Sequence, residues 1–96
     1  MGKVERMLFQ VTPHSYAKDF LLADAEVWNP WLKRQVGFLN KETRVVGNGL
    51  VELVLFWKDQ GSLDKAAAKR AEMLVVDQMM KQRSPAAYTL VSSTVS

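Results

Sequence analysis

The sequence contains no cysteine among its 96 residues and only one histidine. The missing cysteines exclude disulfide bonds, thiolate metal ligands and a cysteine nucleophile. The single histidine leaves no ligand set that matches a known metal-site pattern. The longest uninterrupted apolar run, residues 53–57, is far shorter than the roughly 20 residues that a membrane helix needs. We therefore expect a protein without a metal ion, a cofactor or a membrane span.

Charge of one sign is also scarce. The chain has 13 basic and 10 acidic residues, a net charge of +3 that is dispersed along the sequence. Nucleic-acid binding usually requires a concentrated basic stripe, so no nucleic-acid partner is expected. The N-terminal residues lack an apolar stretch of signal-peptide length, and we expect a cytoplasmic protein. A hydrophobic content of 48% in a chain of this length indicates one globular domain over residues 1–96.

The first third of the chain reads as a strand followed by a helix. Alternating apolar residues predict a strand over residues 4–11. Thr12 and Pro13 then resemble a helix N-cap and a first helical position. The helix is expected to end or kink at Pro30, because the residue before a proline avoids helical backbone angles. A second short helical piece would extend to Gln35.

The remainder predicts two strands, a helix and a last strand. A strand over residues 38–46 is followed by Gly-Asn-Gly at 47–49, which is typical of a hairpin with a type I′ turn. The return strand, residues 50–57, is the most apolar stretch of the chain. A single long helix is expected over residues 62–83, capped by its first residue, a serine. Residues 88–95 complete the set as a strand rich in threonine and valine.

This order, β-α-β-β-α-β, predicts the α+β class and the ferredoxin-like plait. In that fold a four-stranded antiparallel sheet has the first and third strands at its centre and two helices on one face. The third predicted strand is apolar on both faces, with Leu53 and Leu55 on one and Val54 and Phe56 on the other. Two helices cover only one face of such a sheet. We therefore expect a homodimer in which a second copy covers the other face.

Large aromatic residues gather on one arc of the first predicted helix. Phe20 and Trp28 share this arc, and Trp31 would join them if the helix continued through the proline. Trp57 ends the third strand. Rings at helical spacing most often pack in a core. The same four residues, Phe20, Trp28, Trp31 and Trp57, are the candidates for lining a ligand site.

Asp24 lies in the middle of the apolar arc, where a carboxylate is costly unless it is paired or hydrogen-bonded. It is either a structural hydrogen-bond acceptor or a carboxylate of raised pKa that is suited to proton transfer. His14, at the edge of the same arc in the first turn, is the second candidate for a catalytic role. A lone histidine is more often incidental, and both readings stay open.

The stretch from residue 24 to residue 42 resembles a family. The matching residues are Asp24, Ala25, Glu26, Trp28, Pro30, Gly37, Phe38, Lys41 and Glu42. They are similar to the pattern of an uncharacterised family of small bacterial proteins. That family belongs to the dimeric α+β barrel superfamily, whose members resemble the antibiotic-biosynthesis monooxygenases. The similarity covers roughly residues 9–57.

This resemblance implies a range of functions. The superfamily includes cofactor-free monooxygenases, isomerases, stress-response proteins and haem-degrading enzymes, and the last group uses a histidine on the second helix that this chain lacks. Our main hypothesis is a homodimeric barrel that binds a small apolar or aromatic molecule between helices and sheet. The alternatives are a non-catalytic dimeric assembly or stress-response module, and a cofactor-free monooxygenase or isomerase. Whether the protein is an enzyme stays open at this point.

Overall fold

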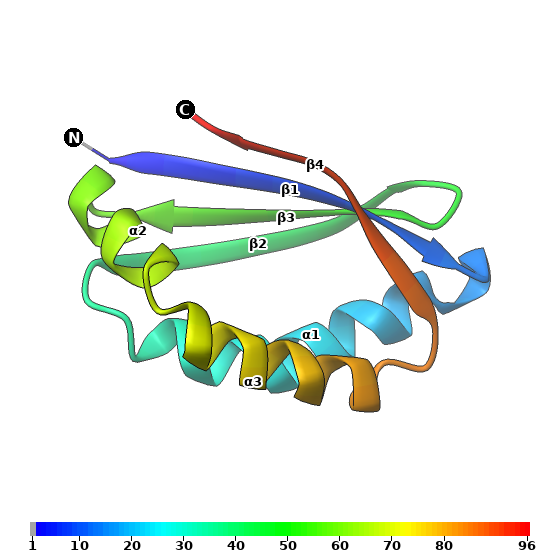
Figure 1. The fold of residues 1–96 in the computed structure, drawn as a ribbon. Coiled ribbons are helices and arrows are strands. Elements are labelled where there is room, and N and C mark those ends of the chain that lie inside the picture. Colours follow the sequence, from blue (N-terminus) through cyan, green and yellow to red (C-terminus); the bar gives the residue numbers. More distant parts are fainter. Residues whose placement is uncertain (1) are drawn as a thin grey trace.

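The computed structural model describes residues 2–96 and contains one antiparallel sheet of four strands (Figure 1). The strands are β1 (Lys3–Thr12), β2 (Phe38–Gly47), β3 (Leu50–Trp57) and β4 (Ala87–Val95). Their order across the sheet is β2-β3-β1-β4, so β1 and β3 lie at the centre. The predicted α+β class and ferredoxin-like topology are confirmed.

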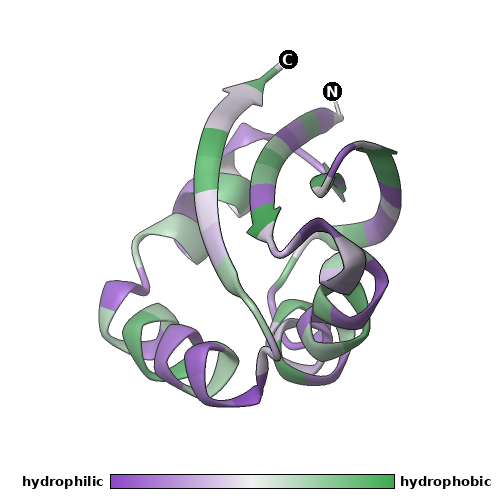
Figure 2. Cartoon of the chain, turned by 90° about the vertical axis from the view of Figure 1, so that its right-hand side faces the viewer, coloured by the Kyte–Doolittle hydropathy of each residue, from purple (hydrophilic) through white to green (hydrophobic). Residues whose placement is uncertain are grey.

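All helices lie on one side of this sheet (Figures 1 and 2). They are the 3₁₀ turn η1 (His14–Tyr16), α1 (Ala17–Lys33), α2 (Gln60–Ala67) and α3 (Arg70–Arg83). The helices α1 and α3 run side by side beneath the strands. Over residues 2–96 the helical layer thus has three α-helices where the sequence predicted two.

The prediction of one helix over residues 62–83 is wrong, because the helix is interrupted at Ala68 and Lys69. The cap of α2 is Asp59, whose carboxylate accepts a hydrogen bond from the Ser62 backbone N–H at 2.7 Å. Lys69 leaves the helical conformation, and its ammonium donates to Gln35 Oε1 at 2.7 Å. After the break α3 packs mainly against α1, whereas α2 contacts β3.

The helix α1 begins and ends later than predicted. Thr12 is the last residue of β1, and Pro13 precedes η1, so neither starts the helix. Pro30 lies inside α1 without ending it. A proline in a helix interior costs about 3 kcal/mol. Burial of Trp31 and Leu32, at 3% and 4% exposure, offsets this cost, since each large apolar side chain contributes roughly 1.5–3 kcal/mol.

The hairpin between β2 and β3 is confirmed, but its turn is not of type I′. That turn requires positive φ at both central residues. Gly49 has φ of 73°, whereas Asn48 does not have a positive φ. The Gly49 carbonyl accepts a hydrogen bond from the Val11 N–H at 2.8 Å. A Cβ at Gly49 would lie 2.5 Å from the Val11 carbonyl oxygen, so glycine permits this close approach.

Gly37 joins α1 to β2 against the buried face of α2. Its φ is +82°, and a Cβ there would lie 2.0 Å from Ser62 Oγ. Replacing Gly37 by alanine should lower the free energy of unfolding by about 3 kcal/mol, from left-handed backbone strain plus overpacking. Chemical denaturation would measure this loss of stability.

Gly61→Ala is the control for this prediction. A Cβ at Gly61 would have Asp59 Oδ1 as its nearest neighbour, 3.6 Å away, so the change should be neutral or stabilising. A Gly37→Ala protein as stable as the wild type would contradict the close packing against α2.

The core fills the space between sheet and helices. Its largest fully buried side chains are Phe20, Met80, Val11 and Val51. On β3, the residues Val51, Leu53, Leu55 and Trp57 are all at most 3% exposed. These are the residues that the alternating pattern assigned to one face.

The opposite face of the sheet is not covered by any helix in residues 2–96 (Figure 1). This open face carries Leu50, Val54 and Phe56 of β3 beside Val4 and Leu8 of β1. Val54 is 6% exposed and Phe56 is half-buried, because neighbouring strands shield them. The predicted two-sided apolar strand is confirmed. Within residues 2–96 no helix has the length and apolarity to cross a membrane.

Candidate functional site

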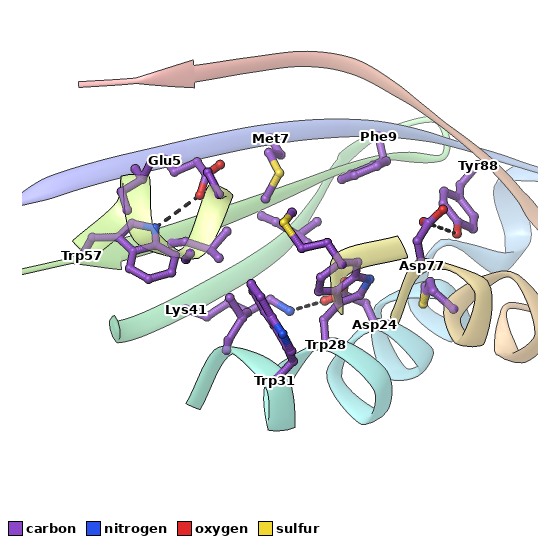
Figure 3. Close-up of a pocket in the computed structure, with 18 of the residues that line it drawn as sticks. Glu5, Met7, Phe9, Asp24, Trp28, Trp31, Lys41, Trp57, Asp77 and Tyr88 are labelled. Atoms are coloured by element: carbon purple, nitrogen blue, oxygen red, sulfur yellow. Dashed lines mark hydrogen bonds and ion pairs between the residues drawn. The ribbon is translucent and has the colours of Figure 1, made fainter. Parts of the chain in front are cut away.

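A cavity of about 210 Å³ lies between the helices and the sheet (Figure 3). Both central strands form its roof, and all three α-helices contribute to its walls. The main lining residues are Glu5, Met7, Phe9, Phe20, Asp24, Trp28, Trp31, Lys41, Leu53, Leu55, Trp57, Leu63, Ala66, Met73, Asp77, Met80 and Tyr88. The core of this domain therefore contains space that its own side chains do not fill.

The structure brings the four predicted aromatic residues, Phe20, Trp28, Trp31 and Trp57, together around this cavity. The rings of Trp28 and Trp31 meet edge to face, with centroids 5.8 Å apart. The ring of Phe20 lies against that of Tyr88, with centroids 5.0 Å apart. Tyr88 was not among the predicted site residues. Trp28 is only partly buried, whereas the other three are at most 3% exposed. The aromatic residues are thus both core and cavity wall.

Asp24 is buried on the cavity wall and forms an ion pair with Lys41 of β2. The side chains are 5% and 7% exposed respectively. Lys41 Nζ also donates to Asn29 Oδ1 at 2.7 Å. Burial raises the pKa of Asp24, and the charge and hydrogen bond of Lys41 partly oppose this rise. The costly carboxylate identified in the sequence is thus paired with an ammonium group.

Lys41 was not among the predicted site residues. Its position on β2 opposite Leu55 places its side chain on the helical face of the sheet. Strict alternation would place Lys41 on the face opposite Phe38, and only the register shift between Phe38 and Asn40 brings both residues to the helical face. A lysine on that face of a strand needs an anionic partner, and Asp24 was the one carboxylate on the apolar arc of α1.

Glu5 lies at one end of the cavity and was also missed. The Trp57 indole N–H donates to Glu5 Oε1 at 3.3 Å (Figure 3). Burial raises the pKa of the Glu5 carboxyl, and this hydrogen bond partly opposes the rise. The alternation over β1 could have revealed it, because Glu5 shares a face with Met7 and Phe9.

Tyr88 and Asp77 lie at the other end (Figure 3). The Tyr88 hydroxyl donates to Asp77 Oδ1 at 3.4 Å. Burial, together with the Asp77 carboxylate, raises the pKa of Tyr88 to about 12. The phenol therefore stays protonated near neutral pH and can only act there as a neutral hydrogen-bonding group. Asp77 also pairs with Lys81 at 3.2 Å.

His14, the second predicted catalytic residue, does not line the cavity. It is exposed in η1, beside Gly49 of the hairpin. The residues that the structure describes contain no group of three or more His, Asp or Glu side chains that could hold a metal ion. The acid–base groups that face the cavity are Glu5, Asp24, Lys41, Asp77 and Tyr88.

The arrangement of strands and helices matches solved structures of oxygenases. SnoaB, a cofactor-independent oxygenase from Streptomyces nogalater, has a TM-score of 0.65 at 16% identity, over 95% of this chain and 91% of SnoaB. A monooxygenase from the ActVA-Orf6 gene of Streptomyces coelicolor, in complex with nanaomycin D, has a TM-score of 0.74 at 11% identity, over 99% of this chain and 85% of that one. The chain has the ferredoxin-like fold of these oxygenases.

The same fold also occurs in protein SO0527 from Shewanella oneidensis, with a TM-score of 0.62 at 21% identity over 99% of this chain and 86% of that one. No family model matches the sequence. No curated protein matches it either. At these identities the likeness concerns the fold, and the chemistry must be argued from the cavity itself.

Proposed function

We propose that this protein binds a small apolar or aromatic molecule in the cavity between its helices and its sheet. The observation that carries the proposal is the unfilled space of about 210 Å³ bounded by six aromatic side chains. An engineered apolar cavity of about 150 Å³ holds benzene, so the space here suits a molecule of one or two rings. Native cores contain few voids larger than a water molecule, and a well-formed apolar pocket with a few polar groups is the first candidate for a binding site.

The solved oxygenases with the same fold support this proposal. SnoaB acts without a cofactor, and the ActVA-Orf6 monooxygenase holds the ligand nanaomycin D. For turnover, a cofactor-free oxygenase or isomerase needs a group that takes a proton from the bound molecule. Asp24 is our candidate, because it borders the cavity and Lys41 stabilises its charged form. His14 faces solvent and is not part of this proposal.

We also propose that two copies associate through the open face of the sheet. The face carries apolar residues at its centre and charged residues of both signs around them, Arg6 and Arg44 with Glu42 and Glu52. A surface with both signs can be complementary to itself across a twofold axis. The cavity is on the other side of the sheet, so binding and association use separate surfaces.

Filling the cavity tests the binding proposal. Ala66 is 4% exposed and lines the space, so Ala66→Leu should occupy it. We expect native mass spectrometry of gently purified wild-type protein to show a bound small molecule that the variant lacks. Calorimetry with one- and two-ring compounds should show at least a tenfold loss of affinity, about 1.4 kcal/mol. The melting temperature should not fall, because the new side chain enters empty space.

The matched control is Ala68→Leu, an exposed alanine two residues further on that does not line the cavity. It should bind like the wild type. A wild-type protein that carries no added mass and binds no compound in the series would contradict the proposal. Equal binding by the Ala66→Leu variant would show that ligands bind elsewhere.

A further inference from the structure

The charges that face the cavity are opposite in sign to the charge of the whole chain. The protein has a formal net charge of +3. Yet among residues 2–96, three of the four charged side chains that line the cavity are acidic, Glu5, Asp24 and Asp77, and Lys41 is the one basic side chain. An excess of carboxylates in a mostly apolar space is costly without cations. The cavity therefore favours a ligand that brings positive charge.

The partners of these carboxylates identify the one that is free to receive such a ligand. Asp24 pairs with Lys41, and Asp77 pairs with Lys81 and accepts a hydrogen bond from Tyr88. Glu5 has no ion-pair partner within residues 2–96, and its side-chain hydrogen bond comes from the Trp57 indole. Burial without a neighbouring cation raises the pKa of Glu5.

The surroundings of Glu5 suit an ammonium group. Figure 3 shows Glu5 beside the Trp57 ring at one end of the cavity, with Met7 and Phe9 next to it along the roof. A carboxylate next to an indole combines a charge-assisted hydrogen bond with a cation–π contact. The helical walls of the cavity, which include Trp28 of α1 and Met80 of α3, are apolar and suit flat rings. Lys41 does not repel such a ligand strongly, because Asp24 neutralises it.

We propose that the ligand is a small aromatic amine: one or two rings held among the aromatic side chains, carrying an alkylammonium group that binds Glu5 beside Trp57. This rests on the proposed function, since it specifies the class of molecule that the same cavity takes. Glu5 would be the residue that determines specificity for the cation.

Three compounds with the same two-ring system separate the possibilities by calorimetry at neutral pH. Tryptamine is cationic, tryptophol is neutral and indoleacetate is anionic. A hydrogen bond to a charged group contributes about 1.5–3 kcal/mol, so tryptamine should bind at least tenfold more tightly than tryptophol. In the Glu5→Gln variant this preference should disappear, while tryptophol affinity stays within about twofold. Retained tryptophol binding also shows that the variant is folded.

Glu42→Gln is the control, since Glu42 is an exposed glutamate on the opposite face of the same sheet. It should keep the preference for tryptamine. Tighter binding of tryptophol or indoleacetate than of tryptamine would overturn the amine inference and leave the proposed function in place. A preference for tryptamine that survives Glu5→Gln would also overturn it. Failure of all three compounds, and of a wider series of one- and two-ring molecules, would overturn the proposed function as well.

Discussion

Replacing Asp24 by asparagine should lower the free energy of unfolding by about 3–5 kcal/mol, because the variant leaves the Lys41 ammonium buried without its counter-charge. Both side chains of the wild-type pair are nearly fully buried, with 5% of Asp24 and 7% of Lys41 exposed. The ion pair joins α1 to β2, so the loss of the carboxylate also weakens the attachment of the helix to the sheet. Urea unfolding followed by circular dichroism measures the change.

A double-mutant cycle isolates the pair itself. The single variants Asp24→Asn and Lys41→Met each leave one buried charge, whereas the double variant leaves none. The double variant should therefore be more stable than the sum of the single effects predicts, by about 2–3 kcal/mol. The control is the ion pair between Arg83 and Glu26, at 3.3 Å, with both side chains exposed, at 64% and 58%. Glu26→Gln should cost less than about 1 kcal/mol.

The result also separates two roles for Asp24. A large loss of stability with strong coupling to Lys41 means that the carboxylate holds α1 on the sheet. A loss below about 1 kcal/mol would contradict the structural role. It would leave Asp24 as a group kept for proton transfer, and the test would then be loss of turnover in a folded protein. The two roles are compatible, because a carboxylate held by Lys41 is also held in position against the cavity.

Replacing Phe56 by glutamate should convert a dimer of this protein into a monomer. Phe56 lies on the open face of β3, half-buried in the single chain, so the monomer can accept a charge there at its surface. In a sheet-to-sheet dimer the same carboxylate would be buried without a partner. That costs several kcal/mol and should raise the dissociation constant by on the order of a thousandfold. Sedimentation equilibrium over a range of concentrations measures the effect.

Val36→Glu is the control for this experiment. Val36 is 78% exposed after the end of α1 and lies outside the sheet, so the same introduced charge should leave the association unchanged. Ligand binding should survive Phe56→Glu, because the cavity is on the other face. A wild-type monomer at the highest concentration, or a Phe56→Glu dimer, would contradict association through the open face. The second outcome would direct attention to α3, where Leu74 is 64% exposed.

Many residues of the candidate site could be predicted from the sequence, although their arrangement around a cavity could not. The alternation along β1 and β3 grouped the side chains that face the helices, and the arc on α1 identified Phe20, Asp24 and Trp28. What the patterns could not supply was the partner of each polar group. Lys41 and Asp24 are 17 residues apart, and Glu5 and Trp57 are 52 apart. Such pairs depend on the register of the strands and on where each helix packs against the sheet.

The sequence by itself determined the order of the elements, the central position of β1 and β3 and the two apolar faces of β3. These follow from local periodicity and turn residues, which act over a few positions. Only the tertiary structure decided that α1 continues through Pro30, that the second helical region divides at Ala68, and that a cavity remains. Each is a balance between a local preference and burial elsewhere. Pro30 is tolerated because Trp31 and Leu32 become buried beyond it, and the cavity remains because three helices on one sheet leave space that their side chains do not fill.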